Sequence, residues 1–452
     1  MRARLQAMLG AVRPLPLIAT FHAWCLQLLQ ESNPDKPLII IDEDEQAALI
    51  AEAAEFAAAS GTSISLKPRD LQERIMRAKQ DLLTPADPAA QGSDPPGDQG
   101  FGAAYRAYQQ RLDRQGLADF EDLIFKLVQR LEADSGFLQA CRDRFRHVFV
   151  DEYQDLNHGQ YRLIRTLAPP RSNSGSLCVI GDPDQSIYGF RGSDAGYFRK
   201  FVEDYPDAGV VRLVRNYRST ETILCASHQV ISAGDGERTR TYSDIEGVRA
   251  ISVLELPNEH AEAECIARTI ESLVGGSGYH SIDTGRVREH PGVGGLGYAD
   301  FAVLMRTNEQ MRVMADVFKK CGIPFQAANR RQLLKRRGIV ELVSLLRLVA
   351  GMGGYADVAR GAAVLAPTLG KNVTQAFQRW GLNNRLTVKD ALPAALRFPI
   401  TGLSRGRQLR LVDFVGRLSD LAIGTARLKA SEAILRLNEL PEIAQLLTDE
   451  ES

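Results

Sequence analysis

The chain has 452 residues and a formal net charge of −1. This length is too great for one ordinary hydrophobic core and predicts several domains. The near-neutral charge excludes a uniformly basic protein that coats nucleic acid, but it allows a local basic groove. No apolar run approaches the roughly 18 residues of a membrane span, and the N-terminal segment lacks the apolar core of a signal peptide, so we expect a cytoplasmic protein without membrane contact. The six cysteines have no CxxC spacing, which predicts neither a zinc site nor a disulfide framework.

The first part of the chain combines helices with two predicted strands. Residues 43–80 are rich in Ala, Gln, Glu and Leu and predict helices, and a linker rich in Pro, Gly and Asp follows at 84–100. Short apolar runs at 147–150 and 176–181 predict buried strands, and the segment 159–168 between them has helical spacing. Strands that alternate with helices are typical of a parallel α/β sheet.

The same alternation continues before the chain becomes helical. Three further apolar runs predict strands, at 210–214, 250–256 and 300–306. A helix is predicted at 220–233, and the composition from residue 338 onward predicts helices only. A GxGxxG pattern formed by Gly292, Gly294 and Gly297 has neither a strand before it nor a helix after it, so we interpret it as a loop and not as a dinucleotide site.

Two adjacent carboxylates, Asp151 and Glu152, follow the first predicted strand of this sheet. Ligands of α/β sheets bind at the carboxyl ends of strands. At such a place one acid can hold Mg²⁺ on the phosphates of a nucleotide, and the second can orient or deprotonate the attacking water. The alternative is that both residues are first-turn residues of the next helix, where the helix dipole favours acids.

The segments after the next two strands favour the nucleotide interpretation. After the strand at 176–181 come Gln185, which can bond a phosphate, and then Tyr188 and Phe190 beside Arg191. Aromatic rings next to arginine form a platform on which bases of a single strand can stack. The third strand ends in "RNYRST", which offers a flat ring and a phosphate-binding arginine.

Three long motifs in this order resemble those of the UvrD/Rep/PcrA family of superfamily 1 DNA helicases. They are "VFVDEYQDLNHGQY", "CVIGDPDQSIYGFRGSD" and "LVRNYRST". Further similarity in "IATFHAWCLQLL", "LADFEDLIFKL" and "FAVLMRTNEQMRVMADVFKKCGIPF" extends the resemblance over nearly all of residues 1–350. One departure is Phe190, because the family usually has Trp at this place; the smaller ring should still stack, but more weakly.

The resemblance implies an α/β fold with two RecA-like parallel-sheet motor domains, both incomplete, and all-α insertions. Its expected parts are a first motor domain at 1–34 and 101–209, a helical insertion at 35–100, a second motor domain at 210–350 and a helical insertion at 351–452. The implied activity is that of an ATP-dependent 3'-to-5' DNA helicase that translocates on single-stranded DNA. The implied substrate is single-stranded or 3'-tailed duplex DNA, and the implied setting is DNA repair.

The resemblance also implies roles for single residues, with ATP and Mg²⁺ as cofactors. Asp151 would bind Mg²⁺, Glu152 would be the general base, and Gln185 would sense the γ-phosphate. Tyr217 would stack on adenine, and Arg218 would reach the γ-phosphate. The residues expected to contact DNA are Thr20, Phe21, His22, Tyr188, Phe190 and Arg191.

Two parts of the family's ATP site have no counterpart in the sequence. The one Gly-Lys dipeptide, Gly370-Lys371, is followed by Asn372 and has Leu365 at the offset where a P-loop needs glycine. No segment resembles the late motif that supplies a second arginine to the phosphate. We therefore expect a fragment of a helicase that is inactive on its own. The alternatives are a non-catalytic relic that binds DNA or a protein partner, and a subunit whose missing motifs come from another chain.

Overall fold

A computed structural model describes residues 2–10, 15–34, 38–59, 64–87, 100–170, 175–233, 240–245, 247, 251–274, 296–327, 338–384, 386–426 and 428–448. The chain separates into two units. One consists of Met1–Val210 with Val340–Ser452, and the other is Val211–Ile339. Gly292 and Gly294 of the GxGxxG pattern lie outside the described residues. The finer division into two motor domains and two helical insertions stays a prediction.

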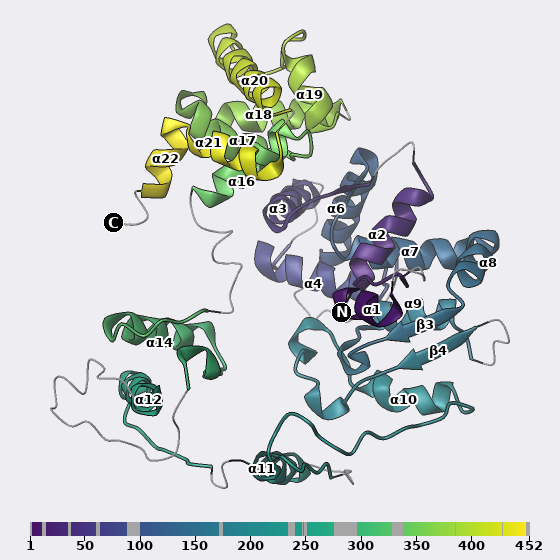
Figure 1. The fold of residues 1–452 in the computed structure, drawn as a ribbon. Coiled ribbons are helices and arrows are strands. Elements are labelled where there is room, and N and C mark those ends of the chain that lie inside the picture. The colour runs from purple at the N-terminus through teal and green to yellow at the C-terminus, as the bar shows by residue number, and fades with distance from the viewer. Residues whose placement is uncertain are drawn as a thin grey trace. The chain divides into compact units, whose positions relative to one another are not determined.

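The N-terminal part of the first unit alternates helices with short strands (Figure 1). Its elements are α1 (Arg2–Leu9), α2 (Phe21–Glu31), β1 (Ile39–Ile40), α3 (Glu43–Ala59), α4 (Pro68–Gln80), α6 (Phe101–Gln115), β2 (Leu117–Ala118), α7 (Asp122–Ala133), α8 (Ser135–Arg144), β3 (His147–Val150), η1 (Tyr153–Asp155), α9 (His158–Leu167), β4 (Ser176–Val179), η2 (Pro183–Gln185), η3 (Gly189–Arg191) and α10 (Gly196–Asp204). The strands predicted at 147–150 and 176–181 and the helix predicted between them are confirmed, although β4 ends two residues early.

The strands β3 and β4 pair in parallel, with His147 opposite Ser176 and Val150 opposite Val179. Helices α9 and α10 pack on this pair through a buried cluster that includes Tyr153 and Ile164. A separate two-stranded parallel sheet joins β1 to β2. The parallel pairing confirms an α/β arrangement for this part of the chain, because parallel strands need a crossover such as α9 between them.

Helices α3 and α4 form the helical segment predicted at residues 43–80, and α6, which was predicted to belong to the first motor domain, packs against them. Their shared core contains Leu71 and Ile75 from α4 and Tyr105 and Tyr108 from α6, all fully buried. Helix α4 begins at Pro68, whose fixed φ suits the first helical position and whose missing N–H has no helical partner to lose there. The expectation of helices is thus confirmed for this segment.

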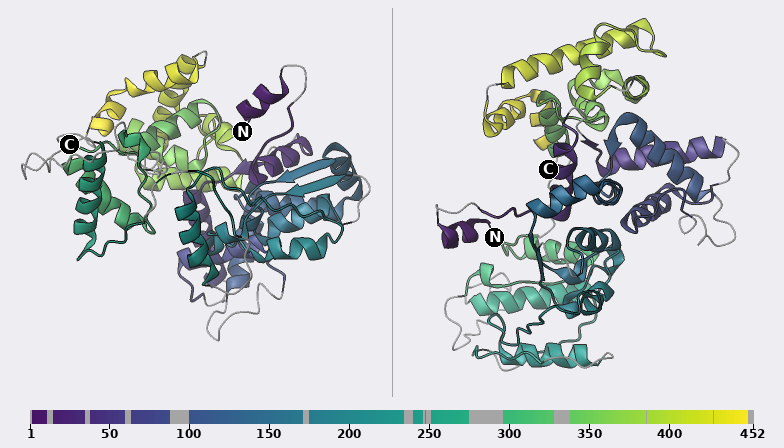
Figure 2. Two further views of the ribbon diagram at one scale, coloured as in Figure 1. Left: turned by 60° about the horizontal axis from the view of Figure 1, so that its bottom comes forward. Right: turned by 90° about the vertical axis from the view of Figure 1, so that its right-hand side faces the viewer.

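The C-terminal part of the first unit is a helical bundle (Figure 2). Its elements are α16 (Ile339–Val349), α17 (Tyr355–Leu365), η5 (Pro367–Leu369), α18 (Lys371–Asn383), α19 (Val388–Ala395), α20 (Arg405–Thr425), α21 (Ala430–Asn438) and α22 (Pro441–Thr448). Its core is centred on Phe377 and Phe414, both fully buried. This confirms the expectation of helices after residue 338. Among the helices that the structure describes, none is long and apolar enough to cross a bilayer.

The second unit contains helices, but the strands predicted for it do not pair. Its elements are α11 (Glu221–Ser232), α12 (Glu259–Val274), η4 (Tyr298–Asp300) and α14 (Asn308–Lys320). In the described residues of this unit the only strand-like pairing is a single bridge between Arg215 and Tyr242. A strand needs a neighbour for its backbone N–H and C=O groups, and the described residues of the predicted runs lack one and expose apolar side chains such as Leu213 (83%) and Leu304 (93%). The described residues therefore do not confirm the prediction of a second parallel sheet.

Candidate functional site

The parallel pairing of β3 and β4 brings the segments after both strands together. The N–H of Ile180 donates to the Val150 carbonyl (2.9 Å), and the N–H of Tyr153 donates to the Ile180 carbonyl (3.0 Å). These bonds carry the register of the sheet past the ends of the strands. Asp151 and Glu152 therefore lie beside the loop that begins at Gly181, and both carboxylates are exposed.

The backbone at Glu152 adopts a conformation that is uncommon for a residue with a side chain. Its φ of 51° and ψ of 45° are left-handed, and its N–H donates to Asp151 Oδ1 (3.1 Å). Strained residues of this kind cost free energy and occur preferentially at functional sites. The next α-helix, α9, begins only at His158 and is capped by Asn157. Glu152 flanks the three-residue η1 (Tyr153–Asp155) but makes no capping bond to it, so the structure gives no support to the alternative that both acids are first-turn residues of the next helix.

Gln185 lies at the end of η2, on the loop that follows β4. Its side-chain amide donates to Asp182 Oδ2 (2.8 Å), and Asp182 Oδ1 accepts from the N–H of Asp184 (3.0 Å). The Gln185 side chain is exposed. The structure thus brings Asp151, Glu152 and Gln185 to one edge of the sheet, as the sequence analysis expected from their places after neighbouring strands.

The aromatic segment after Gln185 forms an exposed platform. Phe190 is 73% exposed and Tyr188 is 42% exposed, and their ring centroids are 6.3 Å apart. The Arg191 guanidinium carbon lies 5.8 Å from the Tyr188 centroid and 5.5 Å from the Phe190 centroid. Apolar rings exposed to this degree beside a cation can stack on bases while the cation attracts phosphate.

The start of α2 holds the remaining residues predicted to contact DNA. Thr20 caps the helix, and its hydroxyl oxygen accepts from the N–H of Ala23 (3.4 Å). His22 stacks on Phe120, with ring centroids 3.8 Å apart and an interplanar angle of 19°. Burial lowers the pKa of His22 to about 4, so the ring is neutral at pH 7 and carries no charge to a phosphate. Phe21 is half-buried and packs against two buried clusters.

Phe120 is a candidate contact residue that the sequence analysis did not single out. It is 51% exposed although one of its faces is covered by His22. An aromatic side chain left this open beside a predicted DNA contact extends the same kind of surface. The sequence signal was its place among the three acids of "ADFEDL", but only the structure shows that Asp119 and Asp122 turn inward.

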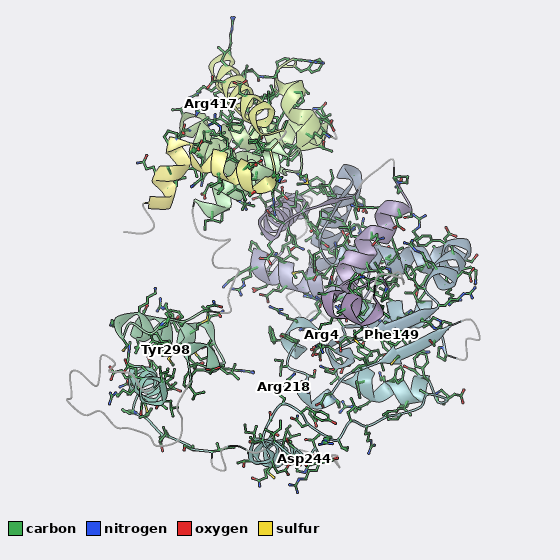
Figure 3. All side chains as sticks on the ribbon, viewed as in Figure 1. Arg4, Phe149, Arg218, Asp244, Tyr298 and Arg417 are labelled. Atoms are coloured by element: carbon green, nitrogen blue, oxygen red, sulfur yellow. The ribbon has the colours of Figure 1, made fainter. Side chains whose placement is uncertain are left out.

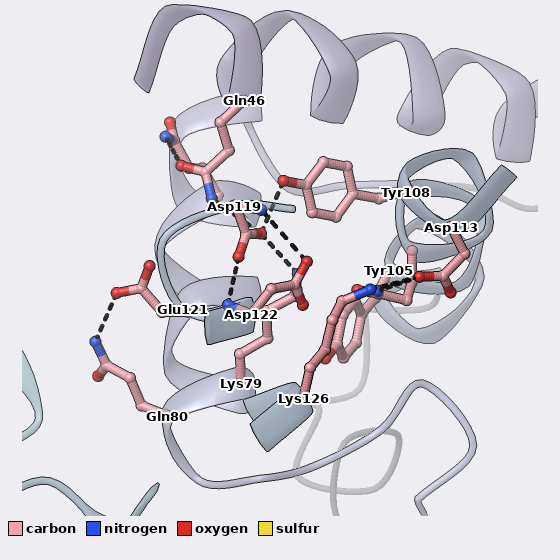
Figure 4. A network of polar contacts seen from close by, with 12 residues as sticks. Gln46, Lys79, Gln80, Tyr105, Tyr108, Asp113, Asp119, Glu121, Asp122 and Lys126 are labelled. Carbon is pink, nitrogen blue, oxygen red and sulfur yellow. Dashed lines mark hydrogen bonds and ion pairs between the residues drawn. The ribbon is translucent and has the colours of Figure 1, made fainter. Parts of the chain in front are cut away.

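Asp119 and the nearby Asp122 belong to a buried polar network, drawn in Figure 4, that fixes the backbone around Phe120. Lys79 Nζ donates to Asp119 Oδ2 (2.6 Å) and to Asp122 Oδ1 (2.8 Å), and all three side chains are buried. Asp119 Oδ2 also accepts from the Tyr108 hydroxyl (2.8 Å). The network joins α4 and α6 to the start of α7, so it ties the helical segment to the strand and helix that present Phe120.

Tyr217 and Arg218 belong to the second unit, just before α11; Figure 3 labels Arg218. Asn216 shapes this segment, because its Oδ1 accepts from the N–H groups of Arg218 (2.8 Å) and Ser219 (2.7 Å). Tyr217 is 76% exposed, and the Arg215 guanidinium carbon lies 5.1 Å from its ring centroid. The exposed ring of Tyr217 is suited to a base and the exposed side chain of Arg218 to a phosphate, whereas the Arg215 guanidinium pairs with Asp244 Oδ2 (2.6 Å).

The carboxylates at the end of β3 are suited to Mg²⁺ that arrives with a nucleotide. Within the described ranges, no three His, Cys, Asp or Glu side chains converge closely enough to hold a metal by themselves. Mg²⁺ normally keeps several waters and is held by one or two carboxylates together with phosphate oxygens. An exposed Asp151 at a strand end fits that demand. Lys371 of the Gly-Lys dipeptide starts α18 in the helical bundle, where no strand leads into it.

Comparison with known proteins agrees with this geometry. Residues 1–206 match the UvrD/REP helicase N-terminal domain, and residues 211–393 match the UvrD-like helicase C-terminal domain. The chain is 29% identical over 457 residues to the ATP-dependent DNA helicase PcrA of Staphylococcus epidermidis, covering 100% of this chain and 59% of that protein. It is 31% identical over 400 residues to the protein of the same name from Staphylococcus aureus, covering 87% of this chain and 52% of the relative. The chain thus spans little more than half the length of these relatives, and it belongs to the UvrD-like DNA helicase family.

Proposed function

We propose that this chain is part of a cytoplasmic, ATP-dependent 3'-to-5' DNA helicase of the UvrD type, which translocates on single-stranded DNA and acts on 3'-tailed duplexes in DNA repair. One observation carries the proposal. The acids Asp151 and Glu152 and the exposed platform of Tyr188, Phe190 and Arg191 follow two strands that are paired in parallel. A nucleotide site and a base-stacking surface on two connected segments are what a translocase needs to couple hydrolysis to movement.

The nucleotide chemistry is assigned to residues at the strand ends. Asp151 would hold Mg²⁺, which when bound with ATP withdraws negative charge from the phosphates. Glu152 would orient the attacking water and take its proton, and Gln185 would contact the γ-phosphate. In the second unit, the exposed ring of Tyr217 would stack on adenine and Arg218 would reach the γ-phosphate. The exposure of all these side chains supports the assignment.

The DNA-binding surface is assigned to the aromatic platform and to the surface of Thr20, His22 and Phe120. Stacking of a base on an aromatic ring contributes roughly 1–3 kcal/mol. Since His22 is neutral at pH 7, we assign it a hydrogen-bonding role toward the DNA backbone and not a charge. Phe21 was also predicted to contact DNA, and its packed position favours a role in holding α2 in place.

Single-strand binding tests the DNA part of the proposal. Fluorescence anisotropy with labelled oligo-dT at low salt should show binding, and Phe190→Ala should raise the Kd about fivefold to a hundredfold. Phe149→Ala is the matched control, because Phe149, labelled in Figure 3, is also 73% exposed but belongs to β3 and not to the platform segment. Absence of binding, or equal effects of the two substitutions, would contradict the assignment.

We further propose that these 452 residues do not hydrolyse ATP on their own. The sequence contains no GxxxxGK[ST] segment, whose backbone N–H groups and lysine would hold the phosphates. Steady-state hydrolysis should therefore stay at background with and without oligo-dT. Turnover that single-stranded DNA stimulates and that Glu152→Gln abolishes would refute this part, while supporting the role of Glu152.

A further inference from the structure

Gln154 lies two residues after Glu152 in η1, and its side chain makes contacts that the proposed mechanism has not used. The residue is 1% exposed. Its Nε2 donates to Glu152 Oε2 (2.7 Å), and its Oε1 accepts from the backbone N–H of Asp182 (3.1 Å). One buried amide thus joins the carboxylate after β3 to the loop after β4.

The chemistry of the partners fixes the orientation of this amide. A backbone N–H can only donate, so the atom of Gln154 that faces Asp182 must be the oxygen. The amide nitrogen therefore faces Glu152, where it donates to a carboxylate that can only accept when it is ionised. Neither Glu nor Met in place of Gln154 could make both bonds, because the bridge needs an acceptor and a donor on one side chain.

The surroundings leave room for this side chain and for little else. A Cβ atom added to Gly181 would come within 2.4 Å of Gln154 Oε1 and 3.1 Å of the Tyr153 nitrogen. A side chain at position 181 would therefore occupy the path of the bridge. The Gln154 carbonyl also accepts from the Ser186 hydroxyl (3.3 Å), which adds a second tie between η1 and the loop after β4.

The chain of bonds continues from Asp182 to Gln185, whose side-chain amide donates to Asp182 Oδ2 (2.8 Å). Three residues after Gln185 the aromatic platform begins. A movement of the loop of residues 182–191 would therefore displace Asp182 and, through the bonds of Gln154, the carboxylate of Glu152. Because the Gln154 side chain is buried, its two bonds are only partly open to water and are not easily exchanged for bonds to water.

We propose that Gln154 is a positioning residue that holds the Glu152 carboxylate in register with the loop of residues 182–191. Through it, hydrogen bonds link the general base to Asp182 and the amide of Gln185, and the three residues of chain that follow Gln185 lead to the platform proposed to bind DNA. The general-base role of Glu152 rests on the proposed function. The linkage itself can be tested without ATP hydrolysis or DNA.

The test measures hydrogen exchange at one backbone amide, that of Asp182, by NMR on the full chain labelled with ¹⁵N-aspartate. Gln154→Met removes the acceptor of this N–H and should speed its exchange roughly tenfold. The decisive variant is Glu152→Ala, which alters an exposed carboxylate that accepts from Gln154 and reaches Asp182 only through it. If Gln154 connects the two, loss of its carboxylate anchor should also speed exchange at Asp182, by roughly threefold to tenfold.

Gln160→Met is the matched control, since Gln160 is another glutamine of this segment whose side chain bonds locally, accepting from the N–H of Asn157 (3.1 Å). It should leave exchange at Asp182 unchanged. If Glu152→Ala also leaves it unchanged, Gln154 merely supports the loop and the proposed linkage is overturned. A faster Asp182 amide in Glu152→Ala together with no binding of oligo-dT would retain the linkage and overturn the proposed function instead.

Discussion

The buried Lys79 offers the sharpest test of how the surface around Phe120 is held. Lys79→Met keeps most of the length and apolar volume of the side chain but removes its charge. The carboxylates of Asp119 and Asp122 would then face each other in the interior without a cation. Burial disfavours the Lys79 ammonium, but the two carboxylates outweigh this and raise its pKa, so the cation is present at neutral pH.

The magnitude follows from the burial of all three groups. Removing one partner of a buried ion pair costs about 3–5 kcal/mol, because the remaining charge is left without compensation. Asp119 keeps the hydrogen bond from Tyr108 (2.8 Å), so we expect the lower half of this range. Replacing both acids as well, in Lys79→Met with Asp119→Asn and Asp122→Asn, should recover a large part of the loss, since no buried charge remains.

The assay is urea unfolding followed by circular dichroism and by hydrogen exchange at core amides of α4 and α7. The matched control is Lys126→Met, because Lys126 Nζ also lies 2.8 Å from a carboxylate oxygen, that of Asp113, but in a partly exposed pair. Exposed pairs contribute about 0–1 kcal/mol. Equal and small losses for Lys79→Met and Lys126→Met would refute the idea that the network supports Phe120.

Three further predictions concern the same unit. Burial raises the pKa of Glu121 to about 7, so the neutral carboxyl contributes stability to the fold below about pH 4.5, and this contribution is lost as the pH rises through 7. Glu121→Gln, which stays neutral, should therefore raise the free energy of unfolding at pH 8 by about 2 kcal/mol. Glu55→Gln, on the exposed face of α3, should leave it unchanged. Burial lowers the pKa of His22 to about 4, so the neutral ring contributes stability to the fold above about pH 6.5, and this contribution is lost as the pH falls toward 4. His22→Phe cannot take up a proton, so the drop in the free energy of unfolding between pH 7 and pH 4, measured by thermal unfolding, should be smaller by roughly 1–2 kcal/mol. Gly181→Ala should lower the urea midpoint by the equivalent of about 1–3 kcal/mol, because the added methyl meets Gln154; an unchanged midpoint would mean that the loop moves aside without cost.

Local patterns were sufficient to predict the elements that carry the site. The apolar run at 147–150 became β3 with the same bounds, because a short apolar run followed by two acids leaves few other arrangements for a buried strand. Helix α9 was predicted within one residue at each end, since Asn157 and Gln160 form a reciprocal cap there. Such signals lie within a few residues of the element that they define.

Contacts between distant segments could not be predicted in this way. The strands expected at 210–214, 250–256 and 300–306 have suitable composition, but pairing depends on a neighbour, and none pairs in the described residues apart from the Arg215 bridge beside the first. Nothing in "ADFEDL" tells which of its side chains face inward, and Phe120 was therefore missed. The same holds for Gln154, whose partner Asp182 lies on the next strand's loop.

Single-stranded DNA is expected on the platform of Tyr188, Phe190 and Arg191, beside the carboxylates of the first unit, and this placement is the central claim. Photocrosslinking with oligo-dT that carries 5-iodouridine, followed by mass spectrometry of the adducts, locates the DNA directly. We predict adducts on the segment 186–192 and at Phe120, competed by unlabelled oligo-dT and lost from the platform in Phe190→Ala. Adducts confined to the helical bundle of residues 339–448, or a pattern unaffected by competitor, would contradict the claim.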